Sequence, residues 1–469
     1  MSQSAIAIFD LGKTNSKLFV ISREGAVLSE ARTNPVWRDE DGVRVLDDET
    51  LFNWMRLSLV DAVTVHGVDR IMFSGHGCTF ALIQGDRLLH PILDYEQEPP
   101  AAVADRIDRL IPDYSETFSP RLPLGFNFGR HILWLADRSP QLLDICDAIL
   151  CYPQFWSWKF SGRKVSEVSY LGCHSHLWAP IPDEFSSLVD SQGWRSKMRE
   201  FARAGEEVGQ YDLELADGTS VALAVHNGVH DSNSALYYYR SLGFSDFTLV
   251  STGTWVVIFN PSSPLETLDR ERDMLANVTV DHNPVATIRF MGGREYDVAS
   301  DGWKQDVSAD AVLAVIEKNA FALPSFAAGG PMPGRDGRFI GPQLQGEERA
   351  AAALLYVALM TDLSLDLIAS SNPIVIDGGL IKTGLYAAVL AALRPSQTVY
   401  SSSNAEGSAF GAAALVFEQF GESPFKNECT VSRPAEIPGL EAYRDFWRAE
   451  LDRLAGNIVK EKQLLERQA

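Results

Sequence analysis

The stretch Ala5-Ile-Ala-Ile-Phe-Asp-Leu-Gly-Lys-Thr-Asn-Ser-Lys-Leu-Phe-Val-Ile21 decides the fold of this chain. The first apolar run of this stretch ends at Asp10, and a second apolar run begins after Lys17. A strand, a turn of small residues and a returning strand predict a β-hairpin.

The turn of this hairpin has the chemistry of a phosphate site. Gly12, Thr14, Asn15 and Ser16 expose backbone N–H groups and short hydroxyls, which suit phosphate oxygens. Asp10 ends its strand below the turn, where a carboxylate can hold magnesium directly or through water. Lys17 can reach back toward phosphate charge. The turn differs from the G-x-x-x-x-G-K-[ST] loop, and an ordinary hairpin turn explains these residues equally well.

A second hairpin of the same design follows half a chain later. Phe247–Ser251 and Trp255–Phe259 are apolar runs on either side of Thr252-Gly-Thr254. Two such hairpins indicate two related lobes. If the two turns faced each other across a cleft, they would hold one triphosphate from both sides.

Length and composition restrict the class of protein. The chain has 469 residues, of which 46% are hydrophobic and 22% charged, so we expect a globular protein of two or three domains. A formal net charge of -21 disfavours nucleic acid and anionic membranes as partners. Five cysteines without C-x-x-C spacing are typical of reduced thiols, and no signal peptide is apparent. We therefore expect a cytoplasmic protein.

Two apolar stretches in the second half predict helices. Ala350–Ala369 is interrupted by two aspartates, so we expect a buried amphipathic helix and no membrane span. Tyr443, Trp447 and Leu451 recur at helical spacing near the end of the chain, which predicts a closing helix packed on a lobe.

An acidic loop lies near the middle of the chain. In Asn227-Gly-Val-His-Asp-Ser-Asn-Ser-Ala235, Asp231 follows a predicted strand and precedes a predicted helix. A carboxylate here can accept the proton of an attacking hydroxyl, as a general base does in kinases. Capping of the helix by Asp231 or Ser232 is the alternative, and spacing alone favours it.

Two glycine-containing segments complete the pattern. Pro373-Ile-Val-Ile-Asp-Gly-Gly-Leu380 is a strand ending in Gly378 and Gly379, whose backbone can approach a ribose or a planar ring closely. Glu406–Ala414 is a helix of small residues, which we expect to let another element approach the nucleotide lobe.

The order of these pieces resembles one family. Asp10–Lys17, His230–Ala235, Thr252–Thr254 and Asp377–Leu380 stand in the order seen in the FGGY carbohydrate kinases, of the actin–hexokinase–chaperone ATPase superfamily. The resemblance covers nearly the whole chain. It implies an α/β fold of two ribonuclease H-like lobes with a central cleft.

The resemblance also divides the chain by role. It implies an N-terminal lobe, residues 1–240, that binds sugar and carries the catalytic base. It implies a C-terminal lobe, residues 241–469, that binds nucleotide and ends in the closing helix. The expected partners are ATP, Mg²⁺ and a small sugar, and a homodimer is common among relatives.

Roles for individual residues follow from the resemblance. It makes Asp231 the catalytic base rather than a cap, and Asp10 the residue that positions magnesium. The residues implied to bind the nucleotide are Gly12, Lys13, Thr14, Asn15, Ser16, Lys17, Thr252, Gly253, Thr254, Gly378 and Gly379.

The sugar site is less sharply marked. The turn Ser74–Thr79 matches the position of a sugar-contacting turn, and His76 is its best polar candidate, with a packing role as the alternative. Asp94 and His230 are the other residues predicted to bind substrate.

The His230-Asp231-Ser232 run looks most like rhamnulokinases and fuculokinases. The resemblance therefore implies ATP-dependent phosphorylation of a small ketose of L-rhamnulose or L-fuculose type. Alternatives are a pentulose such as xylulose, a polyol or tetritol, a phosphatase or chaperone-like ATPase on the same fold, and a catalytically silent regulator that binds sugar or nucleotide.

Overall fold

The computed structural model describes residues 5–334, 336–380, 384–402, 404 and 406–466, with side chains as far as residue 454. The chain divides into two compact units. Unit 1 consists of Met1–Ser245, Leu275–Ala286 and Glu406–Asn427, and unit 2 of Asp246–Met274, Thr287–Ala405 and Glu428–Ala469.

The main sheet of unit 1 grows from the hairpin at the start of the chain. The strand order is β12-β13-β6-β1-β2-β3, and β14 also pairs with β6. β1 is antiparallel to β2 and parallel to β6, which confirms the predicted hairpin. The strands are β1 (Ala5–Leu11), β2 (Ser16–Ser22), β3 (Val27–Thr33), β6 (Val68–Gly75), β12 (Glu207–Glu214), β13 (Ser220–His226) and β14 (Val229–His230).

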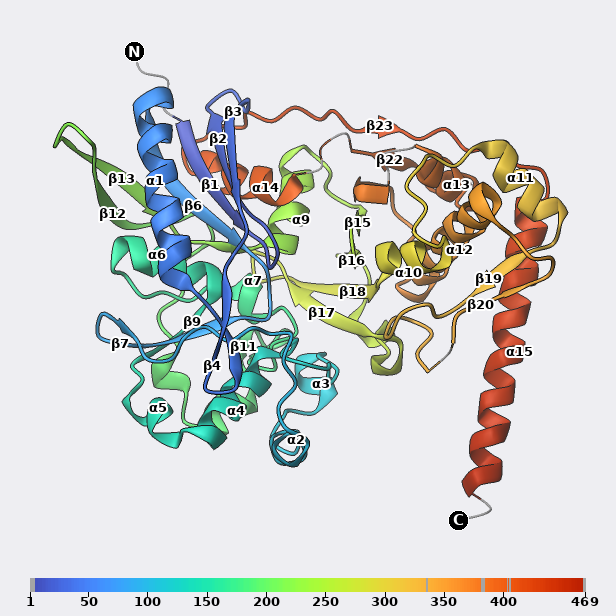
Figure 1. Cartoon of the computed structure of the whole chain (residues 1–469), viewed down its shortest axis with the longest axis horizontal. Coiled ribbons are helices and arrows are strands. Elements are labelled where there is room, and N and C mark those ends of the chain that lie inside the picture. The colour runs from blue at the N-terminus through green and yellow to red at the C-terminus, as the bar shows by residue number, and fades with distance from the viewer. Residues whose placement is uncertain (1–4, 335, 381–383, 403, 405, 467–469) are drawn as a thin grey trace. The chain divides into compact units, whose positions relative to one another are not determined.

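Helices cover both faces of this sheet (Figure 1). Alternate side chains of a strand point to opposite faces. Accordingly Phe9 packs in the core formed with α1 (Asp48–His66) and α6 (Tyr152–Ser161). Ile8 packs in a second core, on the side of α9 (Asp231–Ser241) and α14 (Gly407–Glu418). Burial on both faces explains why β1 is apolar almost throughout.

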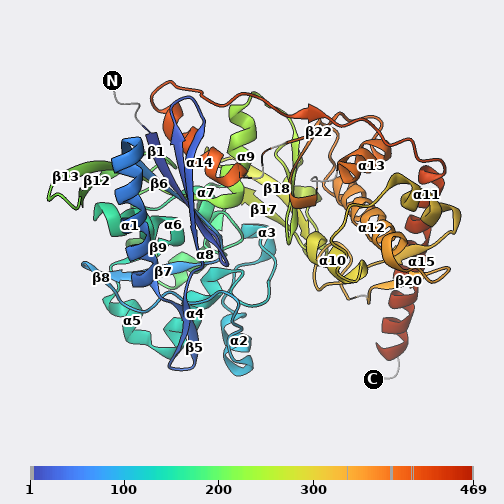
Figure 2. The same ribbon diagram turned by 45° about the horizontal axis from the view of Figure 1, so that its top comes forward.

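α14 belongs to unit 1, which corrects the predicted lobe boundary. The small-residue helix packs against α9 within unit 1, as Figure 2 shows. A Cβ atom added at Gly411 would lie 1.8 Å from the backbone oxygen of Ser234. Only glycine permits this close approach of α14 to α9, and the segment Glu406–Asn427 belongs to unit 1 although it follows most of unit 2 in the chain.

Smaller elements surround this frame in unit 1. Three strands form the sheet β8-β7-β9, and two hairpins pair β4 with β5 and β10 with β11. These elements are β4 (Trp37–Glu40), β5 (Val43–Leu46), β7 (Phe80–Gln84), β8 (Arg87–Leu88), α2 (Ala101–Ile107), α3 (Tyr114–Thr117), α4 (Phe128–Arg138), α5 (Pro140–Ile145), β9 (Ala148–Cys151), α7 (Val168–Leu171), β10 (Trp178–Ala179), β11 (Glu184–Phe185) and α8 (Ser187–Ser191).

The second large sheet is centred on the second predicted hairpin. Its order is β17-β18-β16-β15-β21-β22-β23, with β15 antiparallel to β16 and parallel to β21. The strands are β15 (Thr248–Thr252), β16 (Val256–Asn260), β17 (Met274–Val278), β18 (Pro284–Phe290), β21 (Ile374–Gly378), β22 (Val399–Ser401) and β23 (Thr430–Val431). The remaining elements after residue 290 are α10 (Gly292–Ala299), α11 (Ala309–Glu317), β19 (Phe321–Leu323), β20 (Arg338–Ile340), α12 (Gly346–Leu367), α13 (Leu385–Leu393) and α15 (Leu440–Glu466).

Two helices of unit 2 test the predictions for the apolar stretches. α12 is buried on nearly all sides, so it is a core helix and not the amphipathic helix we predicted. By length and composition alone, it is the single helix in the described part of the chain that could cross a membrane, but 83% of its apolar window is buried inside the protein. α15 buries Tyr443, Trp447 and Leu451, which confirms the closing helix.

Candidate active site

Asp10 lies at the end of β1, where three chain segments meet. Its backbone is in register with Lys17 on β2 and with Ser74 on β6. Burial first, and then the nearby carboxylate of Asp231, raise the pKa of Asp10 to about 7, whereas Lys17 opposes the shift. The structure therefore brings the predicted magnesium residue and the predicted base close enough to interact within unit 1.

The turn after β1 is closed by its own backbone. The N–H of Gly12 donates to the carbonyl of Asn15 over 3.0 Å, and a Cβ atom at Gly12 would lie 2.7 Å from that oxygen. Thr14 and Asn15 are exposed at the apex. Ser16 is fully buried, and its hydroxyl has no hydrogen-bond partner among the described residues. Lys17 points its Nζ to a carboxylate oxygen of Glu406, 2.6 Å away.

Lys13 takes a different direction from the rest of the turn. Its Nζ forms an ion pair with the carboxylate of Asp94, which is 1% exposed, and lies 4.0 Å from the ring centre of Trp37. Arg44 approaches the other oxygen of Asp94 at 3.4 Å. Burial lowers the pKa of Lys13, and the pair with Asp94 opposes this. The structure thus joins a residue predicted to bind phosphate to one predicted to bind sugar.

His76 is held in a buried aromatic setting. Its backbone N–H donates to Leu11 at the end of β1, and its Nδ1 lies 2.9 Å from the carbonyl of Gly77. The rings of Tyr95 and Tyr152 lie 5.3 and 4.6 Å from the imidazole ring, centre to centre. Burial lowers the pKa of His76 to about 4, so the ring is neutral at pH 7. A neutral imidazole beside a phenol suits hydroxyl groups of a sugar.

Asp231 is the first residue of α9. The N-cap position is occupied by His230, whose side chain makes no capping hydrogen bond. The Oδ1 atom of Asp231 accepts from the N–H of Ser232 at 2.6 Å, and the Asp231 side chain is 34% exposed. The alternative in which Asp231 is the N-cap of α9 is therefore wrong, because the N-cap is the residue before it. This half-exposed carboxylate at the N-terminus of α9 is accessible enough to act as a base.

In unit 2, the two predicted glycine turns lie side by side. Thr252 at the end of β15 is opposite Gly378 at the end of β21. The Thr252 hydroxyl donates to the carbonyl of Asp377 and accepts from the N–H of Leu380 at 3.2 Å. Gly378 has φ +88°, and a Cβ atom there would meet the carbonyl oxygen of Thr252. The Thr252 hydroxyl is thus used to join the two turns, whereas Gly253 and Thr254 are exposed.

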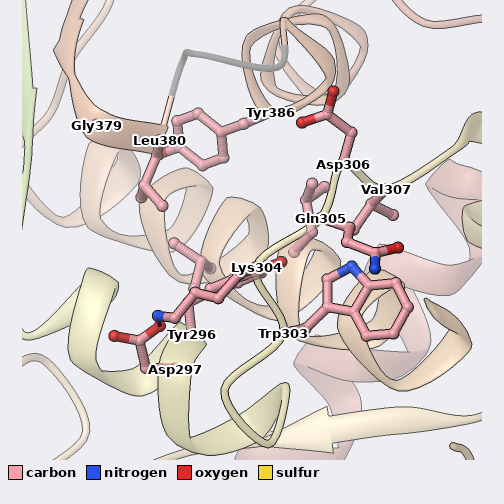
Figure 3. Close-up of a pocket in the computed structure, with 12 residues that line it drawn as sticks. Tyr296, Asp297, Trp303, Lys304, Gln305, Asp306, Val307, Gly379, Leu380 and Tyr386 are labelled. Carbon is pink, nitrogen blue, oxygen red and sulfur yellow. Dashed lines mark hydrogen bonds and ion pairs between the residues drawn. The ribbon is translucent and has the colours of Figure 1, made fainter. Parts of the chain in front are cut away.

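A cavity of about 270 Å³ lies beside Gly379. Figure 3 shows it between α13 and the segment around Trp303. Its walls combine aromatic rings with polar side chains and include Tyr296, Asp297, Trp303, Lys304, Gln305, Asp306, Leu380 and Tyr386. Apart from Gly379, these residues were missed by sequence reasoning, because aromatic and polar residues in separate segments give no local signal.

The residues present fit a magnesium–nucleotide complex. The pKa of Asp10 is raised in part by another carboxylate, and a divalent cation would relieve that repulsion. The turns at Gly12 and Gly378 approach other backbone atoms too closely for a side chain, and because the N–H of Gly12 is bonded within its own turn, phosphate contacts there would come from the exposed Thr14 and Asn15. The aromatic cavity beside Gly379 suits a planar base.

The two α/β units, each built on a hairpin with a glycine-containing turn, have the fold of solved carbohydrate kinases. The family model "Carbohydrate kinase FGGY, C-terminal domain" matches residues 244–424. A solved carbohydrate kinase from Novosphingobium aromaticivorans is 34% identical, with a TM-score of 0.87 over 97% of this chain and 99% of that one. The chain belongs to the FGGY carbohydrate kinase family.

Two further comparisons show other proteins to which parts or all of this chain are similar. L-fuculokinase of Escherichia coli (strain K12) is 25% identical over 290 residues, and this match spans 57% of the chain but only 58% of the length of that enzyme. Ligand-bound xylulose kinase from Lactobacillus acidophilus has a TM-score of 0.77 at 14% identity, covering 96% of this chain and 98% of that one. At this low identity, the likeness to the xylulose kinase shows only that the two chains share a fold.

Proposed function

We propose that this protein transfers the γ-phosphoryl group of ATP to a hydroxyl of a small ketose of L-fuculose or L-rhamnulose type. Membership of the carbohydrate kinases supports the reaction class. The match to L-fuculokinase and the His230-Asp231-Ser232 run support the ketose.

One observation carries the proposal: β6 pairs with the end of β1 at Asp10 and with β14 immediately before Asp231, so the two carboxylates lie near each other, and Asp231 contributes to the raised pKa of Asp10. Phosphoryl transfer needs a base at the attacking hydroxyl and charge neutralisation at the phosphates, and both must act at one phosphorus atom. Two carboxylates in one site meet this need if one accepts a proton and the other holds a cation.

Each residue then has a defined task. Asp231 accepts the proton of the attacking hydroxyl while the oxygen–phosphorus bond forms and the bond from the γ-phosphorus to the leaving oxygen of ADP breaks. Asp10 would hold magnesium, which supplies charge neutralisation at the phosphates. His76 and Asp94 would contact sugar hydroxyls, directly or through the Lys13 ion pair.

The nucleotide would lie mainly on unit 2. The turn at Gly253 and Thr254 is exposed, and the Thr254 residue would contact phosphate oxygens there, whereas the N–H of Gly253 donates to the carbonyl of Trp255 at 2.8 Å. Gly379 borders the aromatic cavity, where Tyr296 and Tyr386 offer faces to a purine. On unit 1, Gly12 and residues 14–17 would contact the phosphates from the first turn, whereas Lys13 is paired with Asp94.

A coupled assay of ADP release tests the reaction. We expect ADP release with MgATP and L-fuculose or L-rhamnulose, and little with xylulose, glycerol or tetritols. Asp231→Asn should lower turnover by about two to four powers of ten, the span of a lost general base, with a much smaller change in sugar binding. Asp61→Asn, an exposed aspartate of α1, is the matched control.

Near-normal turnover of Asp231→Asn would refute the assignment of the base. Sugar-dependent thermal stabilisation without ADP release from any of these substrates would instead indicate a catalytically silent regulator.

A further inference from the structure

Asn233 determines which nitrogen of His230 carries the proton. Its Nδ2 lies 3.3 Å from the backbone oxygen of Ser169 and 3.2 Å from the Nδ1 of His230. A carbonyl oxygen can only accept, so the amide nitrogen, and not the amide oxygen, must face Ser169. The same nitrogen then donates to His230, whose Nδ1 accepts and is unprotonated.

The other ring nitrogen of His230 consequently bears the hydrogen. Burial lowers the pKa of His230, so the ring is neutral at pH 7 with its proton on Nε2. Nε2 lies 3.4 Å from Oδ1 of Asp231 and 3.5 Å from Sγ of Cys173. A carboxylate is the stronger acceptor of the two. The N–H group of His230 is therefore within electrostatic reach of the Asp231 carboxylate, while the contact of Nε2 that has hydrogen-bond geometry is the one to Sγ of Cys173.

The position of the ring leaves it little else to do. His230 is 5% exposed, and a Cβ atom at Gly77 would lie 2.8 Å from its Nε2. The ring of Tyr170 meets it edge-on at 5.6 Å. A substrate has almost no access to the imidazole, unlike the half-exposed carboxylate beside it.

All polar contacts of the Asp231 carboxylate within the described residues go to one oxygen. Oδ1 accepts from the N–H of Ser232 at 2.6 Å and from its hydroxyl at 3.2 Å, and faces Nε2 of His230. These donors hold Oδ1. Oδ2 is then the oxygen presented to a substrate hydroxyl.

We propose that His230 is a positioning residue: with its tautomer set by Asn233, it holds Oδ1 of Asp231 so that Oδ2 accepts the substrate proton. This inference rests on the proposed function of Asp231 as the base. It replaces the predicted role of His230 as a substrate contact.

Ring ¹⁵N NMR on the whole protein labelled at histidine tests the tautomer without any assay of activity. The His230 signals are assigned by their loss in His230→Gln. We expect an unprotonated shift at Nδ1 and a protonated shift at Nε2. The opposite pattern would overturn the proposal whether or not the protein proves to be a sugar kinase.

Kinetics test the consequence for the base. His230→Leu and Asn233→Leu should each lower kcat by about ten- to a hundredfold, the loss typical of a partner that orients a functional group. The sugar KM should change by less than about threefold, because neither side chain touches substrate. The double variant should be no slower than the slower single variant, because both substitutions remove one interaction.

His230→Gln should restore most of the turnover, because its amide can place an N–H near the position of Nε2. The matched control is His282→Gln, at an exposed histidine. A raised KM with unchanged kcat in His230→Leu would identify a substrate contact and refute the proposal. If the leucine variants do not fold, the NMR result and the kinetics of His230→Gln decide. Absence of ADP release from the parent protein would refute the proposed function but leave the tautomer measurement intact.

Discussion

The contact between α14 and α9 at Gly411 allows a strong test of how the fold positions the base. Gly411→Ala would place a methyl carbon 1.8 Å from the backbone oxygen of Ser234, where real structures keep at least 3.0 Å. The helices must therefore separate locally by about 1.2 Å, the difference between these two distances. Because the obstacle is backbone, no rotamer change removes it.

Two opposing effects set the size of the loss. Overpacking costs about 1–3 kcal/mol, and a backbone obstacle belongs at the upper end of this range. Alanine is a better helix former than glycine by about 1 kcal/mol. We expect a net fall of about 2 kcal/mol in the free energy of unfolding. Ser234 is in the first turn of α9, which begins at Asp231, so a shift of about 1 Å should also lower turnover by up to about a hundredfold.

Guanidinium unfolding and the ADP-release assay measure both effects. Ser234→Ala is the comparison, because it removes only the hydrogen bond of 2.6 Å from its hydroxyl to Ser408 and should cost about 1 kcal/mol. The double variant should not recover stability, because the backbone oxygen remains. A Gly411→Ala protein as stable and as active as the parent would refute the argument from helix packing.

Three further predictions concern other parts of the chain. Burial raises the pKa of Glu167 to about 7 from an ordinary 4.5, so the folded state binds this proton more tightly than the unfolded state does. The resulting stability is present below pH 4.5 and is lost as the pH rises to about 7. Between pH 4 and 8 the free energy of unfolding of the parent should therefore fall by about 3 kcal/mol more than that of Glu167→Gln. Parallel curves of the free energy of unfolding against pH would contradict this. Lys13→Met leaves the buried Asp94 with only Arg44 as a cationic partner among the described residues and should lower the free energy of unfolding by about 3 kcal/mol. An unchanged free energy of unfolding with a raised KM for ATP would instead indicate that Lys13 binds the phosphates. Gly378→Ala adds a side chain at φ +88° against backbone and should weaken ADP binding in calorimetry by at least about tenfold; unchanged affinity would separate this turn from the nucleotide site.

Local features of the fold were predictable from the sequence. The hairpins at Asp10 and Thr252, the strand before Gly378 and the closing helix were predicted and are confirmed, because strand pattern, turn residues and helical spacing act over a few neighbouring residues. The family also follows from the order of these pieces. The roles of individual site residues stay predictions, to be tested by the variants above.

Contacts between distant segments were not predictable. Lys13 was expected at the phosphates, but its ion pair joins residues 81 positions apart in the chain. The aromatic cavity beside Gly379 assembles residues from three helices, from the segment Trp303–Val307 and from Gly379 and Leu380 just after β21. His230 carries no mark in the sequence that distinguishes a substrate contact from a partner of Asp231.

The sequence by itself determined that one strand ends within a residue of Asp10 and another at Gly378, and that a carboxylate lies at the start of α9, since short-range sterics and hydrogen bonding suffice for these features. Only the tertiary structure decided that α14 returns to unit 1 and that Asn233 sets the tautomer of His230. Both depend on backbone and side-chain atoms that packing brings within a few ångströms, and the order of residues along a chain does not encode such distances locally.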